Sequence, residues 1–336
     1  MIDRSRRALL ARTAGATGAA LAGAALAGAV GSRSAFAQGY PSAPVRIIVP
    51  YGPGAATDQI GRMIAAELQA ALGGSFIVDN KGGGGSQIGT RMIAEATPDG
   101  MTLGFVDTAF VINPGLVAKL PYDTRRDFAP LSLAATTQLV LNVHASIPAK
   151  TVAEFVALLK ANPGKYSFSS AGVGSAPHLA GEQFRTVAGV AVNHVPYKGG
   201  SAVFADLLAG HVPFGFTTVP SMAEHIRAGT VRALAVTGST RSTLLPDVPS
   251  MAEAGLPAVD AMPLFGLIAP ARVPAEIRER VAAIAAGSVR SGPLHKRLSD
   301  RGFTPIGSSP DEFKARIDRE IDKWSGLVKA AGIKPE

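Results

Sequence analysis

Two loops of glycine and small hydroxyl residues have the composition of an anion-binding site. They are VPYGPGAATD at residues 49–58 and SSAGVGSAPH at residues 169–178. Each follows an apolar run typical of a strand and leads into a helical pattern, and the N–H groups and dipole at a helix start favour negative charge. Related loops occur at 82–86 and 197–201, where Lys198 is the only basic residue. With no arginine in these loops, we expect backbone N–H groups, hydroxyls and two helix starts to hold a carboxylate.

The common signatures of catalysis are missing. No serine has glycine at both −2 and +2, as the nucleophile elbow requires. The P-loop and dinucleotide fingerprints are incomplete, and no two of the 6 histidines are within four residues of each other, which excludes a helical metal-binding pair. Ser175 and His178 leave a hydrolase as an alternative, although spacing identifies no acidic partner. We therefore expect no enzymatic activity, no cofactor and no metal.

The elements that must position these loops alternate between strand and helix, which predicts α/β architecture with parallel sheets covered by helices. Thr57 or Asp58 is expected to cap the first helix, whose buried face carries Ile60, Ile64, Leu68 and Leu72, and Ser86 is expected to cap the second. The predicted strands are 45–50, 76–79, 101–106, 139–143, 166–170, 191–195, 212–217 and 231–237. The predicted helices include 152–160, 203–208, 274–286, 293–300 and 310–331.

Two comparable series of strands and helices predict two similar lobes. If the C-terminal helices pack on the first lobe, the chain must cross between lobes near 138–142 and again near 255–262. We expect 38–140 to be the first part of lobe 1, 141–258 to be lobe 2, and 259–336 to be the second part of lobe 1 with the C-terminal helices. Ligands of open α/β sheets lie at the carboxyl ends of strands, where the glycine-rich loops fall.

The N-terminal residues 1–37 are typical of a cleaved export signal, with a basic start, an Ala-rich run and a small-x-small site at Ala35–Ala37. The run is short and glycine-rich for a membrane anchor. Arg6 and Arg7 resemble the twin-arginine pattern, with the general secretory route as the alternative. Because the signal holds five arginines and one aspartate, the mature chain keeps 28 basic and 24 acidic residues, a net charge of +4. Nucleic-acid binding loses its main support, and 0 cysteines exclude disulfides.

Along the mature chain the sequence resembles the substrate-binding receptors of tripartite tricarboxylate transporters, the Bug receptors. The stretches that carry the resemblance are YPSAPVRIIVPYGPGAATD, NKGGGGSQIG, ATPDGMTLGF, INPGLVAKLPYDTRRDFAPLSLAA, FSSAGVGSAPHLAGE, HVPYKGG, VRALAVTGSTRSTLLPDVPSMAEAGLP and WSGLVKAAGIK. The resemblance implies a type II periplasmic-binding-protein fold, in which two αβ lobes surround a ligand cleft and the C-terminal helices pack on lobe 1.

The resemblance also implies which positions bind the ligand's carboxylate. Lys81–Gly85 departs from the family's usual Arg-Pro-Gly-Ala-Gly, and Thr217-Thr218 replaces a common Asp-Asn. The second change removes a charged acceptor, which makes an amine-bearing ligand less favoured than a purely anionic or neutral-tailed one. The expected ligand-binding residues are Tyr51, Gly54, Thr57, Asp58, Thr108, Ser170, Gly174, Ser175, Tyr197 and Thr218, with Asp58 also supporting its loop.

The function predicted from these observations is that of a periplasmic receptor, exported by its N-terminal signal. It would bind a small carboxylate between two lobes and deliver it to the membrane permease subunits of a tripartite tricarboxylate transporter, as a monomer and without nucleic acid. A sensor that presents its liganded form to a membrane signalling partner is an alternative, because both kinds of protein use the same lobe closure.

Overall fold

The computed structural model describes residues 39–197 and 200–333. The chain divides into two units, Met1–Ala43 and Pro44–Glu336. Of the first unit, residues 39–43 are described, and they include a cis peptide bond between Tyr40 and Pro41. The predicted export signal and Lys198 lie outside the described residues. Within the described part of the chain, no helix combines the length and apolar character that crossing a bilayer requires.

The first sheet of the second unit has the strand order β11-β4-β10-β3-β1-β2. Strands β1, β2 and β3 are parallel, and β10 runs antiparallel between β3 and β4. Ile47 and Ile48 are both buried although they point to opposite faces, because helices cover the sheet on both sides. The strands are β1 (Val45–Val49), β2 (Phe76–Asn80), β3 (Thr102–Asp107), β4 (Phe128–Thr136), β10 (Leu264–Pro270) and β11 (Thr304–Pro305).

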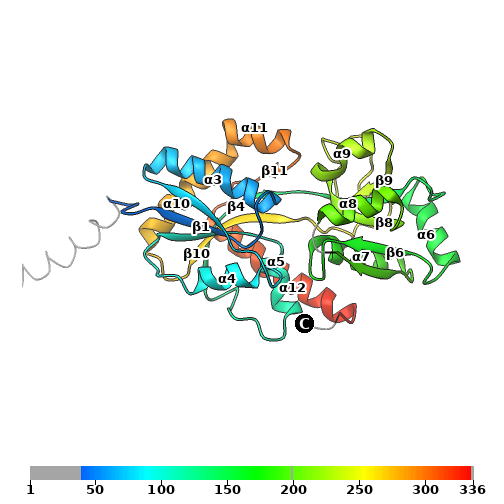
Figure 1. Ribbon diagram of the computed structural model, residues 1–336, viewed down its shortest axis with the longest axis horizontal. Helices are drawn as coiled ribbons and strands as arrows, with labels where there is room; N and C mark the ends of the chain where they lie inside the picture. The colour runs from blue at the N-terminus through cyan, green and yellow to red at the C-terminus, as the bar shows by residue number, and fades with distance from the viewer. Residues whose placement is uncertain (1–38, 198–199, 334–336) are drawn as a thin grey trace, which may run out of the picture. The chain divides into compact units, whose positions relative to one another are not determined.

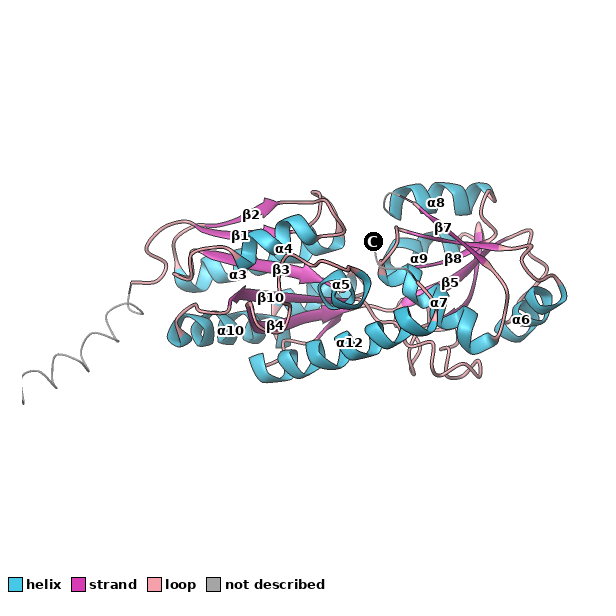
Figure 2. Cartoon of the chain, turned by 90° about the horizontal axis from the view of Figure 1, so that it is seen from below, coloured by secondary structure: helices cyan, strands magenta, loops and turns pink. Residues whose placement is uncertain are grey.

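Helices pack on both faces of this sheet (Figure 1, Figure 2). One face is covered by α3 and α10, and the other by α4, α5 and α12. The predicted apolar face of α3 is confirmed at Ile60, Ile64 and Leu68, which are buried. The helices are α3 (Ala56–Leu72), α4 (Gln87–Ala94), α5 (Ala109–Leu116), α10 (Ala275–Arg290), α11 (Pro293–Asp300) and α12 (Pro310–Ala330).

The second sheet has the order β7-β6-β8-β5-β9, with β6 parallel to both β7 and β8. On one face α6 and α7 enclose an aromatic cluster of Phe155, Phe184 and Phe214. On the other face α8 and α9 bury Leu207 and Met222 against the sheet. The elements are β5 (Leu139–His144), α6 (Val152–Ala161), β6 (Ser167–Ser170), α7 (Ala176–Ala188), β7 (Asn193–Pro196), α8 (Gly200–Ala209), β8 (Phe214–Thr218), α9 (Val219–Arg227) and β9 (Val231–Val236).

The second sheet is inserted into the first along the chain. It occupies the sequence between β4, which ends at Thr136, and β10, which begins at Leu264. The C-terminal helices α10 and α12 return to pack on β4, as predicted. The predicted two-lobed α/β fold is therefore confirmed, while the limits 38–140, 141–258 and 259–336 stay a prediction.

Several local features differ from the sequence-based expectations, which also lacked α5, α9 and β11. Strands β4 and β10, both in the middle of the first sheet, were not predicted. The helix cap predicted at Thr57 or Asp58 was wrong, because the N-cap of α3 is Ala55 and no side chain caps it. Ser86 does occupy the N-cap position of α4, but in a left-handed conformation and without a capping hydrogen bond from its side chain.

Candidate functional site

The first half of the site lies at one edge of the first sheet. Because β1, β2 and β3 are parallel, the loops that follow them meet at the same edge. The loop after β2 passes close to the loop after β1: a Cβ placed on Gly82 would lie 3.3 Å from the nitrogen of Gly52. A larger residue at position 82 would push these two loops apart.

Asp58 fixes the shape of the loop after β1. Its buried carboxylate accepts hydrogen bonds from the Gly54 N–H at 2.9 Å and from the Asn80 amide at 3.0 Å, and it forms an ion pair with Arg62. Burial alone would raise the pKa of Asp58, but the hydrogen bonds from Arg62, Gly54 and Asn80 hold it below the usual value. These contacts are those of a residue that supports its loop. Gly54 has φ +85°, a left-handed conformation that glycine adopts without steric cost.

The start of α3 presents backbone N–H groups with no partner on the described chain. The first N–H bonded within the helix is that of Gln59, which donates to the Ala55 carbonyl at 2.9 Å. The preceding N–H groups of Ala56, Thr57 and Asp58 make no hydrogen bond to another described residue. These groups lie at the positive end of the helix dipole. An anion at this position would therefore meet several donors that the fold has not used.

Tyr51 and Asp107 join the loops after β1 and β3. The Tyr51 hydroxyl donates to Asp107 Oδ1 at 2.6 Å, and the same oxygen accepts the Ala109 N–H at 2.9 Å. Burial raises the pKa of Asp107 to about 6, although both hydrogen bonds act in the opposite direction. Thr108 is buried, and its hydroxyl accepts the Leu264 N–H at 3.0 Å.

Asp107 was missed at the sequence level. The available signal was its position as the last residue of β3, a strand that ends at the edge carrying predicted ligand-binding residues. The start of α5 is thus occupied by the protein's own carboxylate, whereas the start of α3 is not.

The second half of the site is the loop between β6 and α7, whose serine hydroxyls form hydrogen bonds within the loop. Ser170 Oγ accepts the Gly172 N–H at 3.2 Å and lies 2.6 Å from Nε2 of His194. Ser175 Oγ donates to the Gly172 carbonyl at 2.7 Å and accepts the His178 backbone N–H at 3.3 Å, which caps α7. The N–H groups of Ala171, Val173 and Ala176 make no hydrogen bond to another described residue.

Two stacked histidines support this loop from beneath, with ring centroids 4.0 Å apart. His178 Nδ1 accepts the Gly174 N–H at 3.2 Å, so this nitrogen carries no proton. Burial, with the neighbouring His194 and Arg185, lowers the pKa of His178 to about 3, and burial lowers that of His194 to about 4. The Ser175 hydroxyl meets the backbone of His178 and not its ring, so the contacts are those of a helix cap, not of a nucleophile and its base.

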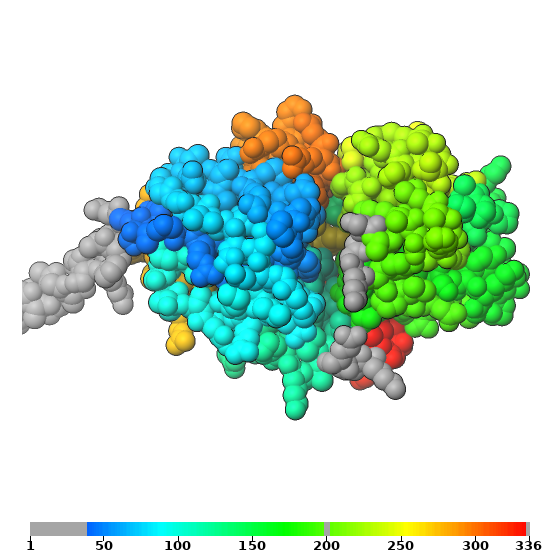
Figure 3. Space-filling view, in the orientation of Figure 1, coloured from blue at the N-terminus to red at the C-terminus, as the bar shows by residue number. Residues whose placement is uncertain are grey.

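The two halves approach each other where Gly174 meets α5. A Cβ on Gly174 would clash with Leu116 Cδ2 and would lie 3.9 Å from Ile112 Cγ2. The space-filling view shows a furrow between the blue-to-cyan surface of the first lobe and the green surface of the second (Figure 3). All ten predicted residues lie at or just beyond the carboxyl ends of parallel strands: Tyr51, Gly54, Thr57 and Asp58 after β1, Thr108 after β3, Ser170, Gly174 and Ser175 at β6, Tyr197 after β7, and Thr218 at β8.

The family model of the tripartite tricarboxylate transporter family receptor matches residues 60–333. The chain belongs to this receptor family. The resemblance seen in the sequence is thereby confirmed. The receptor is 35% identical over 297 residues to protein BugT of Bordetella pertussis, an alignment that covers 88% of this chain and 91% of BugT.

Two solved structures extend the comparison. A structure of an R. palustris protein with adipate has a TM-score of 0.81 and 32% identity, covering 88% of the receptor and 100% of that chain. MatC from Rhodopseudomonas palustris with bound malate has a TM-score of 0.77 and 27% identity, covering 86% of the receptor and 100% of that chain.

The remaining predicted residues of the receptor are partly engaged within the second lobe. Burial, together with the hydrogen bond that the Tyr197 hydroxyl donates to Asp206 at 2.7 Å, raises the pKa of Tyr197 to about 12. Thr218 Oγ1 lies 2.5 Å from the Ser221 hydroxyl at the start of α9. The preceding Thr217 is buried, and its hydroxyl accepts a hydrogen bond at 2.7 Å from Asn142 of the neighbouring strand β5. Ligand contact by the ten residues stays a prediction.

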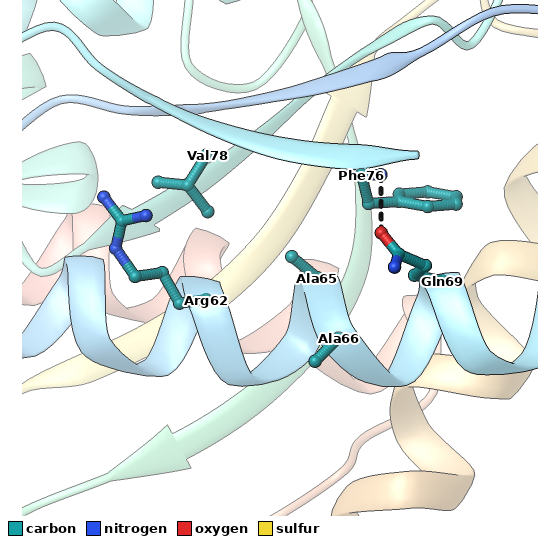
Figure 4. A pocket seen from close by; sticks show the side chains of 6 residues that line it. All are labelled: Arg62, Ala65, Ala66, Gln69, Phe76 and Val78. Carbon is teal, nitrogen blue, oxygen red and sulfur yellow. Dashed lines mark hydrogen bonds between the residues drawn. The ribbon is translucent and has the colours of Figure 1, made fainter. Parts of the chain in front are cut away.

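Two surface hollows of the receptor lie outside the predicted ligand-binding site. One of about 250 Å³ lies between α3 and β2, where the Phe76 N–H donates to Gln69 Oε1 at 3.4 Å (Figure 4). It is lined by Arg62, Ala65, Ala66, Gln69, Phe76 and Val78. The other, of about 320 Å³, lies beside α4. Neither includes a predicted ligand-binding residue. Among the described residues there is no group of three or more His, Asp or Glu side chains able to hold a metal ion.

Proposed function

We propose that this receptor captures a small dicarboxylate in the periplasm and delivers it, as a monomer, to the permease subunits of a tripartite tricarboxylate transporter. The family match supports the transport role, and two structural relatives contain adipate and malate, both dicarboxylates. The signal-like N-terminus supports export. Delivery distinguishes this function from that of a sensor built on the same fold.

The observation that carries the proposal is the uncapped start of α3. Three consecutive N–H groups, those of Ala56, Thr57 and Asp58, are unused by the described chain at the carboxyl end of β1. A carboxylate there accepts hydrogen bonds without needing a cationic side chain. The unused N–H groups of Ala171, Val173 and Ala176 supply the second lobe's contribution to the same anion.

Side chains of both loops form hydrogen bonds within their own loop. Ser170 and Ser175 hold the second loop in shape through Gly172, and Asp58 does so for the first loop. We therefore assign ligand contact chiefly to main-chain donors and loop geometry to these side chains. A ligand held in this way is bound and released without covalent change.

The proposal is tested by calorimetry on the mature protein with mono-, di- and tricarboxylates of matched chain length. We expect at least one dicarboxylate to bind and to be recovered unaltered, as judged by NMR of the released ligand. Absence of binding by every carboxylate, or conversion of the ligand, would refute the proposal. Delivery is tested separately in proteoliposomes that contain the permease subunits, where uptake should require added receptor.

A further inference from the structure

The loop between β6 and α7 exposes the apolar side chain of Val173, while the hydroxyls of Ser170 and Ser175 form hydrogen bonds within the loop. The N–H groups of Gly172 and Gly174 bond to Ser170 and His178, and the Gly172 carbonyl accepts the Ser175 hydroxyl. Val173, between the two glycines, is 37% exposed. Since glycine has no side chain, Val173 provides the side-chain surface at this point of the loop.

The position of Val173 relates this apolar surface to the proposed ligand. The adjoining Gly174 packs against Leu116 and Ile112 of α5, a helix that begins just after the ligand-binding edge of β3. The Val173 N–H is also one of the unused donors of the second lobe. A carboxylate bound to that N–H has its carbon chain within reach of the Val173 side chain.

We propose that Val173 is a specificity-determining residue that contacts the hydrocarbon segment of the bound carboxylate and favours methylene chains over hydroxylated ones. This inference rests on the proposed function. Each methylene that becomes buried against an apolar side chain is worth about 4-fold in affinity. A hydroxyl at the same place gains nothing from the valine and loses its hydrogen bonds to water.

Calorimetry of the mature protein with succinate, glutarate, adipate and malate tests the inference. The variant is Val173→Ser, and the matched control is Val187→Ser, because Val187 is a valine of similar exposure, 41%, near the end of α7. For the wild type we expect affinity to rise about 4-fold per methylene until the chain fills the site. In Val173→Ser this increment should shrink toward 1-fold, with little change for malate, and Val187→Ser should behave as the wild type.

The possible outcomes distinguish a failure of the Val173 inference from a failure of the proposed function. If Val173→Ser leaves the increment unchanged, or weakens every ligand by the same factor, the role of Val173 in specificity is wrong. If neither the wild type nor Val187→Ser binds any of the four ligands or any other small carboxylate, the proposed function itself fails. Circular dichroism melting of both variants checks that the fold is kept. Val173→Ala is a second truncation, and the inference requires its affinity increment per methylene to be closer to that of the wild type than the increment of Val173→Ser is.

Discussion

Replacing Ala56 by proline removes one N–H group from the start of α3 and changes little else. Ala56 is the first residue of the helix, the position where proline is best tolerated. The preceding Ala55 has φ −62° and ψ 156°, the extended conformation that a residue before proline prefers. Because the Ala56 N–H has no partner among the described residues, its loss breaks no hydrogen bond seen in the fold.

The size of the effect follows from the bond that the ligand would lose. A hydrogen bond from an N–H to a charged carboxylate is worth roughly 1.5–3 kcal/mol, which corresponds to affinity weakened by about 10- to 150-fold. Binding should not vanish, because Thr57 and Asp58 keep their N–H groups and the helix dipole remains. Thermal stability should be unchanged or slightly raised, since proline restricts the unfolded chain.

The matched control is Ala275→Pro, at the first position of α10. Its preceding residue, Pro274, has φ −50° and ψ 140°, close to the angles of Ala55. Helix α10 begins at the opposite edge of the same sheet because β10 is antiparallel to β3. Calorimetry should show weakened dicarboxylate binding for Ala56→Pro and wild-type binding for Ala275→Pro. Equal affinity of the two variants, with both folded, would refute the assignment of the anion to the start of α3.

Three further predictions concern the groups that shape the site. Asp58→Ala should lower the free energy of unfolding by about 1–3 kcal/mol in urea titrations, because the Gly54, Arg62 and Asn80 donors lose their acceptor; an unchanged midpoint would contradict the bracing role. The pKa of Asp107, raised to about 6, means that the folded state holds this proton more tightly than the unfolded chain, so its contribution to stability falls as pH rises from about 4 to 6. The free energy of unfolding of Asp107→Asn should therefore rise by roughly 2–3 kcal/mol relative to that of the wild type between pH 4 and pH 7. The lowered pKa values of His178 and His194 cost stability as pH falls, but both proteins share them, so they cancel in the difference. A difference that does not change with pH would exclude Asp107 as its origin. Gly174→Ala should destabilise the protein by roughly 1–2 kcal/mol, since residue 174 has φ +76° and its Cβ would meet Leu116; wild-type melting would show that the loop relaxes freely.

Sequence patterns predicted the parts of the fold that local periodicity determines. The face of α3 formed by Ile60, Ile64 and Leu68 repeats along one helix, so it is visible in a short window. Strand β10, whose seven residues LFGLIAP are all buried, was not predicted, although β5 has nearly the same buried pattern and was. Its partners β3 and β4 lie far away in sequence, so only the complete fold identifies it as a central strand.

The candidate site was predictable in position but not in detail. The glycine and hydroxyl residues picked from the sequence all lie at or beyond the carboxyl ends of parallel strands, as expected. The directions of the Ser170 and Ser175 hydroxyls depend on His194 and on the path of the loop at Gly172, which residue types alone do not reveal. Asp107 acquires its partner Tyr51 only when two loops separated by 56 positions meet.

The placement of β10 between β3 and β4 also determines the order in which the two lobes can be completed during synthesis. A chain synthesised or exported from its N-terminus presents β4 and then every strand of the second sheet before Leu264 emerges. Until then β10 is missing from the first sheet, so no strand links β3 to β4. The second lobe has all its strands first, so the lobe with the uncapped start of α3 is the last to be completed.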